Sequence, residues 1–93
     1  MHYNKNTQFS VYILQSLKNK RYYLGSTINI INRLKEYNLG KVKATKNLRP
    51  WILKLLYPAT TIRQARQLEY RLKKLKSRKI IEKIIKNKEI TIK

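Results

Sequence analysis

The sequence contains no cysteine and no aspartate, and its only histidine is His2. Without cysteine, the chain can form neither a disulfide nor a thiolate metal site. A single histidine near the chain terminus cannot complete a zinc site or a Ser/His/acid catalytic set. The only acids are four glutamates, too few to hold two metal ions with clustered carboxylates. Any metal ion would therefore be single and held by one protein carboxylate.

Glycine and long apolar runs are also scarce. Only Gly25 and Gly40 occur, so the chain has no Gly-rich phosphate loop. No apolar run approaches the ~20 residues of a membrane span. The N-terminal sequence MHYNKNTQFS lacks the apolar stretch of a secretory signal. We expect a soluble protein without a membrane partner, located in the cytoplasm or associated with the nucleoid.

Positive charge is abundant. Lysine and arginine number 23 against four acids, which gives the 93 residues a net charge of +19. A compact domain with so much like charge repels itself unless something anionic accompanies it. Three kinds of partner fit: a nucleic acid, an anionic membrane surface or an acidic protein. The length predicts a single domain over 1–93, with its core at about 9–85.

The pattern of apolar and turn-forming residues predicts an α+β domain with the element order β-β-α-β-α-α. The sequence KNKR predicts the turn of an antiparallel hairpin between the first two strands. Thr27 is expected to cap the first helix and Ser77 the last, and Gly40 to supply a left-handed turn. Strands are expected at 9–16, 22–27 and 50–57, and helices at 28–37, 61–76 and 78–87.

Tyr12 and Tyr23 fall on the two strands of this hairpin. If the hairpin loop has an even number of residues, pairing parity places both rings on one face of the sheet. With an odd loop they would face apart. The plainer interpretation is strand propensity alone, since tyrosine is favoured in strands.

The first helix carries an apolar stripe and one polar pair. Ile30, Ile31 and Leu34 are expected to form the stripe. Arg33 and Tyr37 are four residues apart and therefore share a face. The alternative for this pair is a solvent-facing arginine beside a partly buried tyrosine.

One acid lies in the most basic segment, RQLEYRLKKLKSRK. A helix advances ~100° per residue, which places Glu69 between Ile62 and Ala65, inside the arc that these two residues mark out with Leu68, Leu72 and Leu75, and so toward the packed side. Burying a charged carboxylate is costly unless cations or a metal compensate. The alternative is that Glu69 lies at the edge of the arc, where it reaches solvent or pairs with Lys73.

A run of cations with an aromatic residue beside them follows Gly40. Phosphate binding needs charge of this kind, whereas an ordinary solvated face mixes its signs. Nucleic acid is therefore the favoured partner. The membrane alternative depends on the basic amphipathic segment RKIIEKIIKNK, whose apolar stripe we expect the small core to need. The run consists of Lys41, Lys43, Lys46, Arg49 and Trp51.

Several short blocks, in order, resemble the motifs of the GIY-YIG endonucleases. VYI and, eleven residues after its tyrosine, YLG resemble the two blocks that name the family, with Tyr12, Tyr23 and Gly25 at the matching positions. NRLKEYN resembles the family's helix motif with its arginine, here Arg33. ARQLEYRLK resembles the segment with the metal-binding glutamate, here Glu69.

The loop sequence YNLGKVKATKNLRPW refines this resemblance. It is similar to the loop of short stand-alone members related to the excision-repair nuclease subunit, with Gly40, Thr45, Pro50 and Trp51 at the matching positions. Two departures stand out. Val-Tyr-Ile replaces Gly-Ile-Tyr in the first block, and Ser26 stands where some repair members have a lysine.

The resemblance implies a small three-stranded antiparallel sheet flanked by helices, and metal-dependent hydrolysis of phosphodiester bonds in branched, nicked or damaged DNA, or in RNA. It implies that Glu69 holds one divalent cation, Mg²⁺ or Mn²⁺. Arg33 would stabilise charge on the phosphate, Tyr12 or Tyr23 would take the proton from water, and Tyr37 would orient or relay it. The expected nucleic-acid contacts are Gly25, Lys41, Lys43, Lys46 and Arg49.

The catalytic module fills nearly the entire chain, so either recognition is loose or a partner protein supplies specificity, as in DNA repair. The alternative function is that of a degenerate family member, a basic protein that binds nucleic acid without cleaving it. Glu69 separates the two hypotheses, because phosphate binding has no use for this acid.

Overall fold

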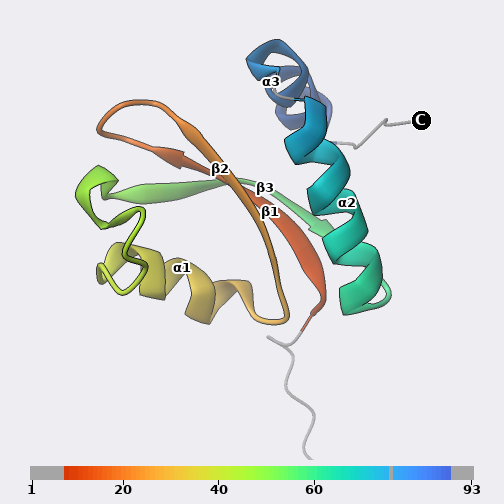
Figure 1. Ribbon diagram of the computed structural model, residues 1–93, viewed down its shortest axis with the longest axis horizontal. Helices are drawn as coiled ribbons and strands as arrows, with labels where there is room; N and C mark the ends of the chain where they lie inside the picture. Colours follow the sequence, from red (N-terminus) through yellow and green to blue (C-terminus); the bar gives the residue numbers. More distant parts are fainter. Residues whose placement is uncertain (1–7, 76, 89–93) are drawn as a thin grey trace, which may run out of the picture.

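The structure is a computed structural model that describes residues 8–75 and 77–88. Three antiparallel strands form one sheet in the order β2-β1-β3 (Figure 1). Strand β1 (Ser10–Ser16) lies in the middle, between β2 (Tyr22–Thr27) and β3 (Trp51–Pro58). Strand β2 is therefore one outer edge of the sheet.

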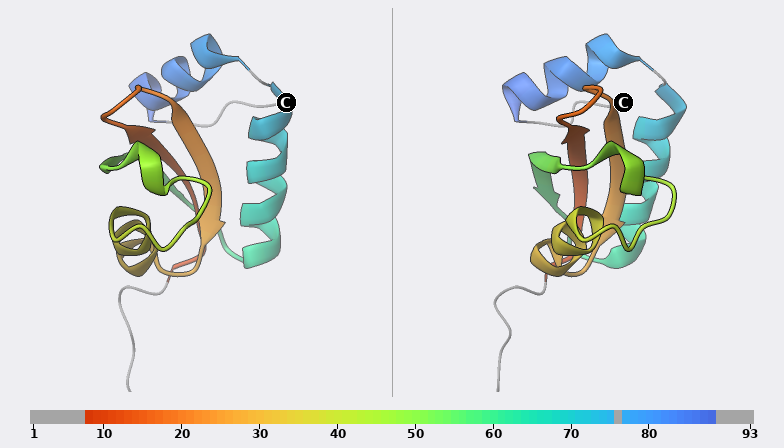
Figure 2. Two further views of the ribbon diagram at one scale, coloured as in Figure 1. Left: turned by 60° about the vertical axis from the view of Figure 1, so that its left-hand side comes forward. Right: turned by 90° about the vertical axis from the view of Figure 1, so that its left-hand side faces the viewer.

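The helices cover both faces of this sheet, as Figure 2 shows. Helix α1 (Ile30–Asn38) and the short 3₁₀ helix η1 (Lys46–Leu48) lie on one side, and α2 (Ile62–Leu75) lies on the other. Helix α3 (Arg78–Asn87) follows α2. The predicted α+β class, the three-stranded antiparallel sheet and the order β-β-α-β-α-α are confirmed.

The central strand β1 is buried on both faces. Val11 and Ile13 pack with residues of α2 and α3, whereas Tyr12 and Leu14 pack with residues of α1. A strand covered on both sides needs apolar residues without alternation, and β1 has this pattern. The sheet thus separates two cores, and the tyrosine of the first motif belongs to the one beneath α1.

A bulge in β3 lets this strand contribute to both cores. Its pairing with β1 shifts by one residue between Ile13, which is opposite Leu55, and Leu14, which is opposite Leu53. A one-residue shift turns the side chains that follow to the other face. Leu55 consequently packs beneath α2, while Trp51 packs beneath α1. The alternation of residues in this strand did not predict the bulge.

The start of α1 differs from the prediction. Asn29, and not Thr27, is the N-cap, because its side chain accepts a hydrogen bond from the backbone N–H of Asn32 at 3.1 Å. Thr27 instead accepts one from the backbone N–H of Asn29, also at 3.1 Å, and so orders the loop before the helix. The predicted cap of α3 is confirmed, since the Ser77 side chain accepts from the backbone N–H of Ile80.

The apolar faces of α1 and α3 are packed against the sheet. In α1, Ile30 and Leu34 lie one turn apart and contact the core, but Ile31 is 52% exposed, so its predicted place in the stripe is wrong. In α3, Ile81 and Ile84 are buried. These residues of the apolar stripe, which the membrane hypothesis needs at the surface, therefore lie in the core. Within the described residues, no helix has the length and apolar character needed to cross a membrane.

Candidate active site

The hairpin register places both motif tyrosines on the face of the sheet that α1 covers. Pairing ends with Gln15 opposite Tyr22, so the loop between them contains an even number of residues. Tyr12 is opposite Gly25, and Tyr23 precedes Gly25 by two residues, so all three share one face. The hypothesis of a shared face is confirmed.

Four aromatic rings pack together on this face. The ring centroid of Tyr37 lies 5.7 Å from that of Tyr23 and 6.1 Å from that of Tyr12, in edge-to-face contacts. Trp51 closes the cluster, 5.9 Å from Tyr23. Such pairs are stabilising beyond the area that they bury. Tyr23 alone of the four is well exposed, at 36%, so it connects this cluster to solvent.

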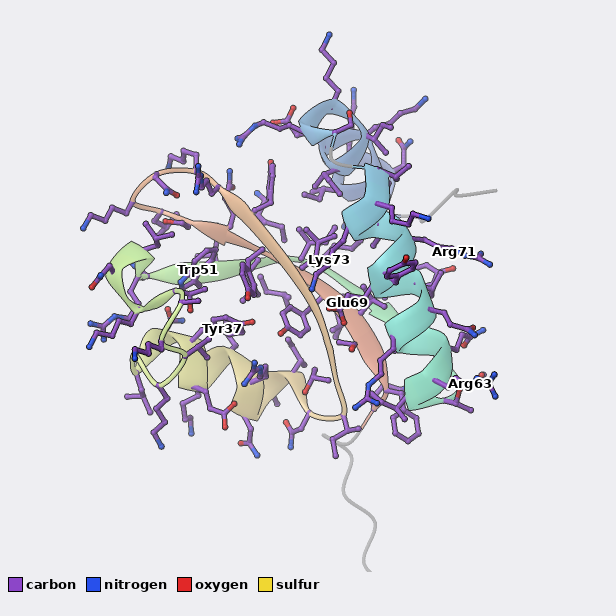
Figure 3. The ribbon with its side chains drawn as sticks, viewed as in Figure 1. Tyr37, Trp51, Arg63, Glu69, Arg71 and Lys73 are labelled. Carbon is purple, nitrogen blue, oxygen red and sulfur yellow. The ribbon has the colours of Figure 1, made fainter. Side chains whose placement is uncertain are left out.

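The burial of Trp51 corrects one prediction. Trp51 is 2% exposed, and its Nε1 donates a hydrogen bond to the backbone carbonyl of Thr45 at 3.1 Å. Figure 3 shows it with Tyr37 between the sheet and α1. The apolar ring fills the space that α1 and the following loop enclose, so it cannot serve as an aromatic group of the basic surface.

A chain of hydrogen bonds joins the hydroxyl groups to Arg33. The hydroxyl oxygens of Tyr12 and Tyr37 are 2.9 Å apart, and Arg33 Nε donates to the Tyr12 hydroxyl at 3.4 Å. The guanidinium also lies over the Tyr37 ring, 5.0 Å from its centroid, and pairs with Glu36 at 3.0 Å. Arg33 and Tyr37 therefore share a face, as predicted, and also contact each other. Tyr12 joins them from a strand 25 residues away from Tyr37.

These contacts hold two groups in fixed protonation states. Burial raises the pKa of the Tyr37 hydroxyl well above its ordinary value, and the hydrogen bond with Tyr12 raises it further. The hydrogen bond to Tyr12 raises the pKa of the Arg33 guanidinium, against a smaller opposite effect of burial. Tyr37 thus keeps its proton and can donate it in the bond with Tyr12, while Arg33 keeps its positive charge.

Gly25 makes room for the Tyr12 hydroxyl. A Cβ atom at this position would lie 2.2 Å from the Tyr12 hydroxyl oxygen, which no side chain could accommodate without displacing the ring. The glycine of the second motif is therefore needed for a close approach. Gly40 meets a different requirement, because its φ of +80° lies in the predicted left-handed region.

Glu69 lies on the opposite side of β2. Its Oε1 accepts a hydrogen bond from Ser26 Oγ at 2.7 Å, and its Oε2 pairs with Lys73. The side chain is 20% exposed, so it faces the sheet as predicted and also makes the ion pair of the alternative. Figure 3 shows Glu69 and Lys73 pointing toward β2, whereas Arg63 and Arg71 point away from it.

The two parts of the candidate site meet at the edge of the sheet. Ser26 follows Gly25, and successive residues of a strand face opposite sides, so Glu69 approaches β2 from the α2 side. In residues 8–75 and 77–88, no hydrogen bond joins Glu69 to the other four predicted catalytic residues. Because β2 is an edge strand, a phosphate at this edge could be reached from both faces.

The donor set beside Glu69 fits Mg²⁺ or Mn²⁺ better than a metal that needs several protein ligands. Nowhere in the described part of the chain do three or more His, Cys, Asp or Glu residues gather. Magnesium keeps several waters and binds through one or two carboxylates together with a substrate phosphate. One carboxylate that a neighbouring hydroxyl holds in place satisfies that requirement.

Two of the predicted nucleic-acid contacts line a basic cavity of about 440 Å³. Lys46 and Arg49 lie there, while Lys41 and Lys43 are exposed outside it. Lys18 joins them from the hairpin turn, where its Nζ donates to the Asn47 carbonyl at 3.1 Å. Lys18 is distant in sequence from Lys46 and Arg49, and only its charge pointed to a role. Sequence analysis therefore did not predict it as a nucleic-acid contact.

One family model matches this chain. The model of the GIY-YIG catalytic domain matches residues 8–88, which include the whole sheet and all three α-helices. Comparisons with curated proteins and with solved structures gave no significant match.

Proposed function

This chain belongs to the GIY-YIG family of catalytic domains, which are nucleases that act on DNA, and we propose that it is a metal-dependent endonuclease. Its proposed substrates are branched, nicked or damaged DNA. The observation that carries the proposal is the hydrogen-bonded convergence of Tyr12 from β1 with Arg33 and Tyr37 from α1, beside the strand edge where Glu69 lies.

Arg33 would stabilise the negative charge that develops on the phosphate. Its guanidinium is always charged and is partly exposed, at 37% of the side chain. The ion pair with Glu36 is exposed on both sides, and such pairs contribute little to stability. The Glu36 carboxylate can therefore turn away and leave Nη1 to a phosphate oxygen, while Nε stays on the Tyr12 hydroxyl.

Exposure distinguishes the two tyrosines. Tyr12 is 2% exposed and its hydroxyl is engaged by Tyr37 and Arg33, so we assign it the positioning of Arg33. Tyr23 is 36% exposed, so we assign it the contact with the attacking water. As a general base, Tyr23 would accept the proton that water loses at its phenolic oxygen.

Glu69 would hold the divalent cation, with Ser26 fixing the orientation of its carboxylate. When bound, the cation would polarise the phosphate and stabilise the leaving oxygen. Lys73 occupies Oε2 in this structure, and an ammonium and a metal ion compete for the same oxygen. With the cation on Glu69, Lys73 would therefore leave the carboxylate. Its ammonium group could then contact a DNA phosphate at the β2 edge.

Cleavage of nicked and branched DNA with and without a chelator tests the proposal. We expect cleavage that requires Mg²⁺ or Mn²⁺. Glu69→Gln should keep DNA binding and lose cleavage. Tyr23→Phe should lose more cleavage activity than Tyr12→Phe. The matched control is Glu82→Gln, which makes the same change in an exposed ion pair of α3 and should cleave normally.

Two results would contradict the proposal. Equal cleavage by Glu69→Gln and the wild type would remove the metal role of Glu69. Binding by the wild type without cleavage in either metal would leave the alternative, a basic protein that binds nucleic acid.

A further inference from the structure

A second cavity, of about 460 Å³, opens beside the candidate active site at the edge of β2. Its lining comes from β2, from the C-terminal half of α2 and from the beginning of α3. The volume falls in the ~300–1,000 Å³ range of small-ligand sites. Neither the predicted motif roles nor the proposed mechanism uses this cavity.

The lining combines an apolar surface with surrounding cations. Leu24, Leu72 and Ile81 supply apolar side chains, and all three belong to the core beneath α2 and α3 or pack against it. Arg21, Lys73 and Arg78 supply positive charge, the last two in ion pairs with Glu69 and Glu82. Among the described residues that line the cavity, none is acidic. This chemistry suits a flat apolar group that carries negative charge beside it.

Tyr22 adds an aromatic plane. The Arg78 guanidinium lies 4.7 Å from the centroid of the Tyr22 ring, within the range of a cation–π contact. Arg78 Nη1 also donates to the backbone carbonyl of Lys20 at 3.0 Å, which ties α3 to the hairpin turn. The Tyr22 ring and the guanidinium are therefore held as one wall of the cavity.

The cavity shares two lining residues with the candidate active site or its contacts. Tyr23, which we assign to the attacking water, and Lys73, which pairs with Glu69, both line it. A phosphate held at the β2 edge would therefore place the next nucleotide of the same strand near the cavity mouth.

We propose that this cavity binds an unpaired nucleobase of the DNA strand, next to the phosphate that is cleaved. The inference rests on the proposed nuclease function and specifies its substrate. A base in a duplex is stacked and paired, whereas a base in a flap, bulge or gap can leave the stack at lower cost. Stacking on the wall that Tyr22 and the Arg78 guanidinium form then binds it in any sequence, while Arg21 contacts a flanking phosphate. The chain thereby selects DNA with unpaired nucleotides over intact duplex.

Binding to two DNA duplexes that differ by one extra nucleotide tests this proposal. The full chain is titrated, in chelator, with a paired duplex and with the same duplex that carries a single-nucleotide bulge of 2-aminopurine. We expect about tenfold tighter binding to the bulged DNA, from the stacking of one base. The fluorescence of 2-aminopurine should fall as the base stacks on Tyr22.

Variants of the cavity wall show where the base binds. Tyr22→Leu should bring the affinity ratio close to one, and Tyr22→Phe, which keeps the ring, should retain it. Arg21→Gln should weaken binding to bulged DNA more than to duplex. Its matched control is Arg71→Gln, since Arg71 points away from the sheet (Figure 3), and this change should leave the ratio unaltered. Circular dichroism checks that each variant is folded.

Equal affinity of the wild type for the two duplexes would overturn the proposal, and so would an unchanged ratio in folded Tyr22→Leu. Cleavage is measured separately with added metal, so the two proposals can fail independently. A chain that cleaves DNA but shows no preference for the bulge retains the nuclease function and loses the base site. A chain that prefers the bulge without cleaving retains the base site alone.

Discussion

The buried hydroxyl of Tyr37 makes stability depend on pH at the scale of a single residue. Its pKa in the folded chain is raised by burial and by Tyr12. Above about pH 10 an unfolded tyrosine loses its proton, but folded Tyr37 keeps it. The folded state then binds more protons than the unfolded state, so the free energy of unfolding falls as pH rises. We expect the wild type to lose more stability than Tyr37→Phe between about pH 9 and about pH 11, as urea unfolding would measure.

An exposed tyrosine serves as the control for this prediction. Tyr70 is 63% exposed, so Tyr70→Phe should keep the pH dependence of the wild type. The hydrogen bond lost in Tyr37→Phe costs about 1 kcal/mol, which lowers its stability at every pH and leaves the slope as the informative quantity. Parallel slopes for the wild type and Tyr37→Phe would contradict the buried, protonated hydroxyl.

Local spacing predicted some single-residue relations and not others. The four-residue separation of Arg33 and Tyr37 was enough to predict their shared face, because helix geometry fixes it, whereas Ile31 did not join the predicted stripe. The hydrogen bond between Ser26 and Glu69 joins residues 43 positions apart. It depends on how α2 sits on β2, which no local pattern encodes. Sequence reasoning therefore treated Ser26 as a lost lysine and missed its hydrogen bond with Glu69.

At the scale of elements, α3 is held by one apolar stripe whose members differ in burial. Ile84 is 3% exposed, whereas Ile80 on the same helix is 40% exposed. We expect Ile84→Ala to lower the free energy of unfolding by about 2–5 kcal/mol, because it leaves a cavity in the core. The same change at Ile80 should cost about 0.5 kcal/mol. Urea unfolding compares the two, and similar losses would show that α3 is not packed as described.

The elements themselves were predictable, but their ends and irregularities were not. Periodicity located all six strands and helices because each has a strong apolar pattern. The start of α1 was misplaced because Thr27 and Asn29 can both cap a helix, and the Thr27 hydroxyl instead accepts from the backbone N–H of Asn29. The bulge opposite Ile13 and Leu14 arises because Trp51 must face α1 and Leu55 must face α2. Both requirements come from contacts with residues that are distant in sequence, so local sequence patterns do not predict them.

For the whole molecule, composition predicted an anionic partner but not where it binds. The net charge of +19 is a property of the entire chain, and a scan along the sequence cannot show which cations converge. The basic cavity joins Lys18 to Lys46 and Arg49, and the cavity beside β2 joins Arg21 to Arg78. Both arise where a hairpin end meets a later element. The fold therefore brings cations from distant parts of the sequence together at two cavities.

The excess of positive charge predicts how DNA affinity depends on salt concentration. Each phosphate that the chain neutralises releases counterions, so DNA affinity should fall linearly with log salt concentration, by a slope of about 0.9 per phosphate contact. We expect Lys46→Gln and Arg49→Gln each to reduce the slope by about one, because both line the basic cavity. Arg71→Gln, on the outer side of α2 (Figure 3), should leave it unchanged. Fluorescence anisotropy across a salt series measures these slopes, and binding that does not respond to salt would indicate an acidic protein as the partner.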